Sequence, residues 1–169
     1  MDISGIAIID LQQVTEKIDL EYYVVIDQLN RNFKALLGGA PATGIYLDLC
    51  RQLCALVSSI MEERRAILVP YLMELQHKEA DGHNCSTCSG GCKVQHGIYV
   101  ASLSGSHAKL RAMIDDVQRC RTSVGEGDAG YRISIYELTV TNALLDLFEL
   151  EEQQLIPEIV KAQKAIHAY

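Results

Sequence analysis

The sequence predicts an all-α fold, an antiparallel up-down-up-down bundle of four helices that carries one Cys/His-rich loop. Three observations favour this fold class. Leu, Ile and Ala dominate the apolar residues while Trp is absent. Apolar residues recur at helical intervals in four long stretches, and short loops separate these stretches. A chain of 169 residues is long enough to bury a core, so we expect one domain over residues 1–169.

The first helix is expected over residues 10–37. Asp10 and Gln13 have the spacing of a capping box at its start. Gly38-Gly39 followed by Pro41 supplies a stop at its end. Its apolar stripe consists of Val14, Ile18, Val25, Leu29, Phe33 and Leu36.

The second helix is expected over residues 44–78, and a Cys/His-rich loop over residues 79–92 follows it. Pro70 lies inside this helix. Because proline has no N–H to donate, we expect the helix to bend or split near residues 66–69. The predicted stripe consists of Leu49, Leu53, Leu56, Val57, Ile60, Ile67, Leu68, Leu72 and Leu75.

The third and fourth helices are expected over residues 93–120 and 131–167, with a loop rich in glycine and acidic residues between them. Pro157 lies inside the fourth helix. The predicted stripe of the third consists of Ile98, Leu103, Leu110, Met113, Ile114 and Val117. That of the fourth consists of Ile135, Leu138, Leu144, Leu145, Phe148, Leu155, Ile156 and Ile159.

The loop between the second and third helices concentrates ligands for a soft or borderline metal. Cys85, Cys88, Cys92 and His96 present three sulfurs and one imidazole within a short span, and His83 is a fifth candidate. Cys92 and His96 are four residues apart and share one face at the start of a helix. The helix N-terminus also favours thiolate over thiol.

Zinc in a tetrahedral Cys₃His site is the first choice for this loop. Iron, or an iron–sulfur cluster held by three cysteines and one further ligand, is the alternative. A third interpretation is a flexible loop with reactive or disulfide-linked cysteines. The remaining cysteines, Cys50, Cys54 and Cys120, are expected to pack as small apolar side chains.

The chain is predicted to contain two copies of one helical hairpin. Residues 64–70, Arg-Arg-Ala-Ile-Leu-Val-Pro, align with residues 151–157, Glu-Glu-Gln-Gln-Leu-Ile-Pro, when the two prolines are matched. Residues 30–37 of the first helix align with residues 107–114 of the third.

On these residues the sequence resembles the bacterial hemerythrin-like proteins. Their second and fourth helices carry a Glu-Glu-x-x-Leu-Phe-Pro type signature, to which Glu151 through Pro157 is similar. Their first and third helices carry a histidine followed by an apolar run, as at His107. The resemblance spans nearly the whole chain and implies a four-helix bundle.

The resemblance also implies an interior site for two irons, but most of its ligands are absent from this sequence. Three histidine positions and one Glu pair are substituted, by Asn30, Ile60, Leu147 and Arg64-Arg65. His107, Glu151 and Glu152 remain, and they are too few ligands for a di-iron centre.

An ion pair is the predicted replacement for the interior metal. If Arg64 or Arg65 points inward, it can pair with Glu151 or Glu152, with Asn30 and His107 hydrogen-bonded nearby. A buried arginine without such a partner would be too costly. The alternative is that both arginines lie in solvent.

Composition also bears on partners and location. The formal net charge is −7 and the basic residues are scattered, which argues against nucleic acid. The N-terminal residues lack the features of a signal peptide, and charged residues follow too soon for a membrane span. We expect a cytoplasmic protein with no membrane partner. A homodimer stays open because many helical bundles dimerise.

The sequence predicts a non-catalytic metal-binding helical protein, redox or metal responsive, in preference to an enzyme. A second hypothesis is a hemerythrin-like iron protein that binds or senses oxygen or nitric oxide, or repairs iron centres. A third is an enzyme or carrier that uses the loop cysteines directly.

Overall fold

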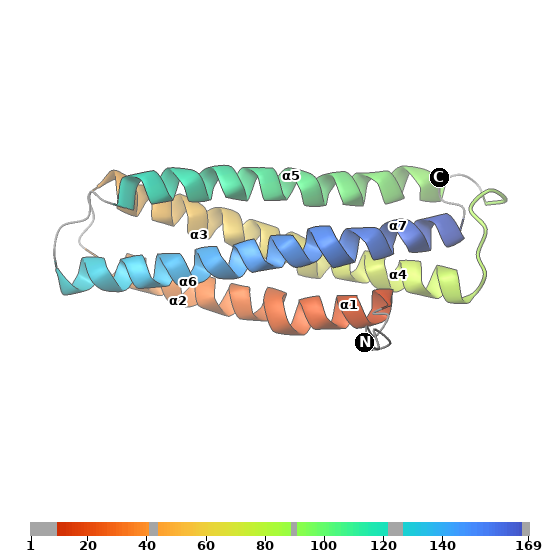
Figure 1. The fold of residues 1–169 in the computed structure, drawn as a ribbon, viewed down its shortest axis with the longest axis horizontal. Coiled ribbons are helices and arrows are strands. Elements are labelled where there is room, and N and C mark those ends of the chain that lie inside the picture. Colours follow the sequence, from red (N-terminus) through yellow and green to blue (C-terminus); the bar gives the residue numbers. More distant parts are fainter. Residues whose placement is uncertain (1–9, 41–43, 89–90, 122–126, 167–169) are drawn as a thin grey trace, which may run out of the picture.

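The computed structural model describes residues 10–40, 44–88, 91–121 and 127–166, and within these ranges the chain is helical without strands. Four long helical rods lie side by side (Figure 1). The rods are, in chain order, α1–η1–α2 (Leu11–Ile18, Asp19–Tyr23, Val24–Gly38), α3–η2–α4 (Ile45–Glu63, Arg64–Leu68, Val69–Ala80), α5 (Gly91–Cys120) and α6–η4–α7 (Asp128–Leu150, Glu151–Leu155, Ile156–Ala165). These bounds lie within three residues of the predicted ones.

Contacts between the rods define their order in space. Helix α2 packs against α3 on one side and α6 on the other, and α3 packs against α5. Toward the opposite end, α4 contacts both α1 and α7. In the described part of the chain, none of the helices is both long and apolar enough to cross a membrane.

Three rods contain one turn of π-helix, in which a backbone N–H donates to the carbonyl five residues earlier. These bonds run from Val24 to Asp19, from Val69 to Arg64 and from Ile156 to Glu151. Pro70 and Pro157 are the second residues after the ends of the second and third of these turns. The second helix was expected to bend or split at residues 66–69. It does not split there, and the π-turn η2 interrupts its regular α-helix at that place.

A π-turn inserts one residue into the helix, and this insertion moves the buried stripe of the first rod. Val25 was expected in the core but is 45 % exposed. Tyr23 and Ile26 are buried instead. One extra residue rotates the following side chains by about 100° around the helix axis, so an uninterrupted helical period assigns the wrong face.

The buried face of the fourth rod is more polar than the apolar pattern indicates. Ile135, Leu138 and Leu145 were expected in the core, but they are 44 %, 37 % and 38 % exposed. Glu137 and Thr141 are buried on the face that packs inward, and Thr141 donates to Glu137 at 3.0 Å. The predicted stripe is therefore wrong at these three positions, whereas its members Leu144 and Phe148 are buried as expected.

The neighbours Leu144 and Leu145 test this assignment of faces. Leu144 is fully buried, so Leu144→Ala should lower the free energy of unfolding by about 2–5 kcal/mol through lost contacts and a cavity. Leu145→Ala is the matched control and should cost less than about 1 kcal/mol because its side chain keeps contact with water. Urea denaturation of both variants gives the two values. A larger cost at Leu145 would show that the face assignment is wrong.

Candidate metal centre

The end of α4 fixes the backbone where the Cys/His loop begins. Gly82 has a φ of +65°, a left-handed conformation that glycine adopts without steric cost. The N–H of Asp81 donates to His77 O and that of His83 donates to Lys78 O, both at 2.9 Å. These bonds satisfy carbonyls at the helix C-terminus and hold the backbone of His83 against the end of α4.

A compact turn around Asn84 carries the two cysteines that follow. The Asn84 side chain accepts from the N–H of Ser86 at 2.9 Å, and its carbonyl accepts from the N–H of Thr87 at 3.2 Å. The N–H of Cys85 donates to Ile166 O at 2.8 Å, which attaches the loop to the end of α7. Cys85 is therefore held in the interior, with 2 % of its surface exposed, while Cys88 is half-buried.

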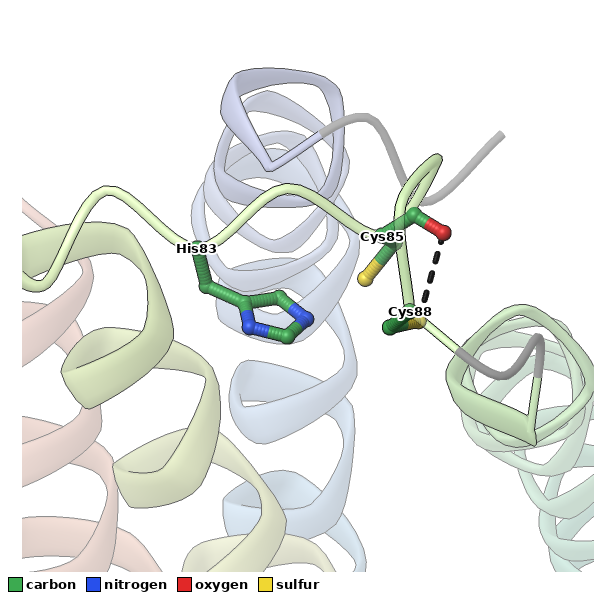
Figure 2. Close-up of side chains that lie close together, drawn as sticks. All are labelled: His83, Cys85 and Cys88. Atoms are coloured by element: carbon green, nitrogen blue, oxygen red, sulfur yellow. Dashed lines mark hydrogen bonds between the residues drawn. The ribbon is translucent and has the colours of Figure 1, made fainter.

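His83, Cys85 and Cys88 bring one ligand atom each to within 4.8 Å of the other two. Figure 2 shows the imidazole of His83 pointing toward the two cysteines. Cys88 Sγ donates to Cys85 O at 3.2 Å. Nε2 of His83 is buried and has no hydrogen-bond partner in the described part of the chain. A buried imidazole nitrogen aimed at two thiols is the arrangement that a metal ion would satisfy.

The three donors fit a metal ion by chemistry and nearly by distance. Donor atoms around a tetrahedral zinc lie about 3.7 Å apart when the bonds to zinc are about 2.3 Å long. The three atoms therefore need to approach one another by about 1 Å at most, which side-chain rotation can supply. The group could hold a metal ion, and it leaves one tetrahedral position for a further ligand.

The remaining two predicted ligands follow shortly in the chain. Cys92 and His96 belong to the first two turns of α5, which begins at Gly91. Their side chains lie outside the described residues. Their part in the site stays a prediction from the spacing.

The predicted interior ion pair is present between Arg64 and Glu151. Arg64 is 1 % exposed and Glu151 is fully buried. Nε of Arg64 donates to Glu151 Oε1 at 2.9 Å, and Nη2 donates to Oε2 at 3.3 Å. The pair joins the first residues of the two π-turns η2 and η4, which are equivalent positions in the internal repeat.

Further polar side chains complete the surroundings of this ion pair. The hydroxyl of Tyr23 donates to Glu151 Oε1 at 2.6 Å, and a ring nitrogen of His107 bonds to Oε2. Arg64 Nη2 also donates to the hydroxyl of Ser106. The other ring nitrogen of His107 lies 2.9 Å from an oxygen of Glu152. His107 thereby links the buried carboxylate of Glu151 to the exposed carboxylate of Glu152.

The electrostatics of the pair follow from burial and from these bonds. Burial raises the pKa of Glu151, but hydrogen bonds from His107, Arg64 and Tyr23 and the charge of Arg64 outweigh burial, so the pKa is lowered. Burial, followed by the charge of Glu151, raises the pKa of Tyr23 well above its ordinary value. The network therefore holds a carboxylate, a guanidinium and a neutral phenol.

Arg65 and Asn30 are not part of this network, contrary to the prediction for Asn30. The side chain of Arg65 is 46 % exposed and lies 3.7 Å from Asp19. Asn30 is buried but donates to Cys54 O at 2.9 Å and to Ser58 Oγ at 3.0 Å. Its side-chain hydrogen bonds therefore go to α3 and not to the ion pair between Arg64 and Glu151.

A second buried carboxylate was not found from the sequence. Glu137 is fully buried and accepts from Arg121 at 2.7 and 3.0 Å. Thr141 and the hydroxyl of Tyr46 also contact it, at 3.0 and 3.4 Å. The sequence contained one indication of this buried carboxylate, a glutamate and a threonine four residues apart within an otherwise apolar stretch of helix.

Cys50 and Cys54 pack in the core as expected. Both are at most 1 % exposed, and burial raises the pKa of each thiol to about 12. They are therefore protonated at neutral pH and poor metal ligands.

Comparison of the chain with models of protein families, with curated proteins and with solved structures gives no match. The resemblance to hemerythrin-like proteins stays a prediction. Fold and side-chain geometry define the class: an all-helical protein with a His/Cys group that could hold a metal ion. The functional argument rests on that geometry.

The adjacent residues Arg64 and Arg65 allow a matched test of the ion pair. Arg64→Met should lower the free energy of unfolding by about 3–5 kcal/mol, because it leaves the Glu151 carboxylate buried without a cation. Arg65→Met should change it by less than about 0.5 kcal/mol, because exposed ion pairs contribute little. Denaturant titration at pH 7 measures both. Equal costs would contradict the interior placement of Arg64.

Acid denaturation tests the ionisation of Glu151. Its pKa in the folded chain lies below the ordinary 4.5, so the ionised carboxylate stabilises the fold above about pH 4.5. This stability is lost as the pH falls through the lowered pKa. Glu151→Gln should be less stable at pH 7 and should lose less stability between pH 7 and the acid range.

The exposed neighbour provides the control for this pH dependence. Glu149→Gln makes the same change from carboxylate to amide on an exposed side chain and should alter the free energy of unfolding at pH 7 by less than about 0.5 kcal/mol. Thermal unfolding followed by circular dichroism from acid to neutral pH compares the three proteins. Identical slopes for wild type and Glu151→Gln would rule out the lowered pKa.

Proposed function

We propose that this chain is a non-catalytic metal-binding protein that holds one zinc ion in the loop between α4 and α5. The observation that carries the proposal is the buried Nε2 of His83, which lacks a hydrogen-bond partner in the described residues while its ring points toward Cys85 and Cys88. Imidazole nitrogen and thiolate sulfur are the ligands that zinc prefers in structural sites.

The proposed ligand set consists of His83, Cys85 and Cys88 with a fourth ligand from the start of α5. Cys92 is the first candidate and His96 the second, since both follow the loop within two helical turns. Four protein ligands close the coordination sphere, and a closed sphere is typical of structural zinc rather than catalytic zinc. Zinc would then connect the end of α4 with the start of α5.

We further propose the antiparallel up-down-up-down, hemerythrin-like bundle as the setting of this site. The link between α4 and α5 and the end of α7 lie at the same end of the molecule, which supports this topology (Figure 1). The backbone bond from Cys85 to Ile166 supports it as well. The metal would sit outside the helical interior, in a loop.

The interior residues favour this function over an iron centre between the helices. Both oxygens of Glu151 already accept hydrogen bonds, from Tyr23 and Arg64 on one side and from Arg64 and His107 on the other. The guanidinium of Arg64 supplies the positive charge that a metal would supply. An interior iron would have to displace this cation.

Elemental analysis of protein purified without chelators tests the zinc proposal. The wild-type chain should contain about one zinc ion, and the double variant Cys85→Ser/Cys88→Ser should contain less than about a tenth of that, because it loses two thiolate ligands. Cys120→Ser is the matched control and should retain the ion, since α5 places it at the far end from the loop. Cys92→Ser and His96→Gln, measured in the same way, identify the fourth ligand.

The absorption spectrum of the same preparation separates zinc from iron. A zinc protein is colourless, whereas an iron–sulfur cluster or an oxo-bridged di-iron centre absorbs visible light. A coloured wild-type protein that loses its colour in the double serine variant would replace zinc by a cluster at this loop. Iron that persists in the double variant would overturn the loop proposal and favour the interior.

A further inference from the structure

Cys85 and Cys88 bring two sulfur atoms together on one short turn. Their ligand atoms lie within 4.8 Å of each other, and Cys88 Sγ already bonds to the carbonyl of Cys85. A disulfide needs a sulfur–sulfur distance of about 2.05 Å. The Cys-x-x-Cys spacing places both residues on the same turn, so rotation of the two side chains can close the remaining distance.

The two cysteines differ in their access to solvent. Cys85 is 2 % exposed, whereas Cys88 is half-buried. An oxidant that approaches from solvent therefore reaches Cys88 first, and Cys85 stands behind it as the resolving sulfur. An exposed sulfur backed by a second one is the arrangement of redox-sensing cysteine pairs.

The helical cysteines Cys50 and Cys54 offer a contrast within the same chain. They are buried in α3, and burial raises the pKa of both thiols to about 12. At neutral pH they are protonated and shielded from solvent, so they react slowly with oxidants. They serve as an internal standard for the loop pair.

We propose that Cys85 and Cys88 form a reversible thiol–disulfide pair that peroxide oxidises, and that closure of the disulfide releases the metal. The release rests on the proposed zinc function, because it concerns the same two ligands. A sulfur in a disulfide no longer carries the thiolate charge that binds zinc. Metal-bound and disulfide forms are therefore mutually exclusive states of one loop.

The oxidation balances with hydrogen peroxide as the oxidant. The Cys88 thiolate attacks one peroxide oxygen, the O–O bond breaks, and the departing hydroxide takes a proton to become water. This step leaves a sulfenic acid on Cys88. The Cys85 thiolate then attacks that sulfur and expels hydroxide, which is protonated to a second water. Two thiols and one peroxide give one disulfide and two waters, with two electrons moving from sulfur to oxygen.

The first arm of the test uses the full chain without metal. One equivalent of hydrogen peroxide should remove two thiols and lower the mass by two hydrogens. Peptide mapping should place the disulfide between Cys85 and Cys88, with Cys50 and Cys54 still reduced. Cys92→Ser should form the same disulfide, and Cys88→Ser should not. A disulfide from either cysteine to Cys92 would overturn the proposal.

The second arm uses the zinc-loaded chain and a chromogenic zinc chelator. Peroxide should release zinc in step with disulfide formation, and dithiothreitol should restore zinc binding. With free zinc at about ten times its dissociation constant, disulfide formation should slow about tenfold, because only the metal-free fraction reacts. Disulfide formation with zinc still bound would overturn the coupling.

The two arms separate this inference from the metal function. A chain that binds zinc but forms no disulfide between Cys85 and Cys88 overturns the redox pair and leaves the zinc site standing. A chain that forms the disulfide but binds no zinc overturns the zinc site and the coupling together.

Discussion

A guanidinium and a carboxylate meet in the interior of this molecule, and the need to satisfy both charges constrains all four helical rods. Taking two ions out of water costs several kcal/mol each, so every donor and acceptor around them must find a partner. Those partners come from η1, η2, α5 and η4, through Tyr23, Arg64, Ser106 and Glu151. A slip of the second or fourth rod by one residue would separate the two charges, and a slip of the first or third would remove a hydrogen bond from them.

Three of these partners share a backbone feature. Tyr23 is the last residue of η1, while Arg64 and Glu151 are the first residues of η2 and η4. The extra residue of a π-turn moves the adjoining side chains around the helix, and here it directs polar groups inward. The prolines that follow η2 and η4 suit this geometry, because each lacks the N–H that a regular turn would require. Backbone geometry and buried charge therefore support one another.

The sequence allowed prediction of the helices and of an interior ion pair between one of two arginines, Arg64 or Arg65, and one of two glutamates, Glu151 or Glu152, but it did not decide which residues would meet. It did not allow prediction of the helical register. No residue type marks a π-turn, so Val25 was assigned to the core in place of Tyr23. Glu137 was missed for a different reason: its partner Arg121 lies directly after the end of α5, and apolar periodicity contains no information about contacts between separate parts of the chain.

The His/Cys group of the loop was accessible to sequence reasoning because its members are close in the chain. His83, Cys85 and Cys88 lie within six residues, so local turns alone bring them together. Asn30 and Arg65 show the limit of the same reasoning. Asn30 was expected beside the interior ion pair and Arg65 was one of its two candidate arginines, yet Asn30 bonds to α3 and Arg65 faces solvent. Sequence position indicates which turn of a helix a residue occupies, but it does not determine which side chain or backbone group the residue contacts.

The separation of the two polar centres determines what each can do. The interior centre is filled by its own side chains, and both oxygens of Glu151 are engaged. A chemical change there would expose a buried charge and cost stability throughout the fold. The loop is attached to the helices by the end of α4 and by one backbone bond to Ile166. A change at the loop sulfurs of the kind proposed above would therefore leave the charged interior, which keeps the four rods in register, in place.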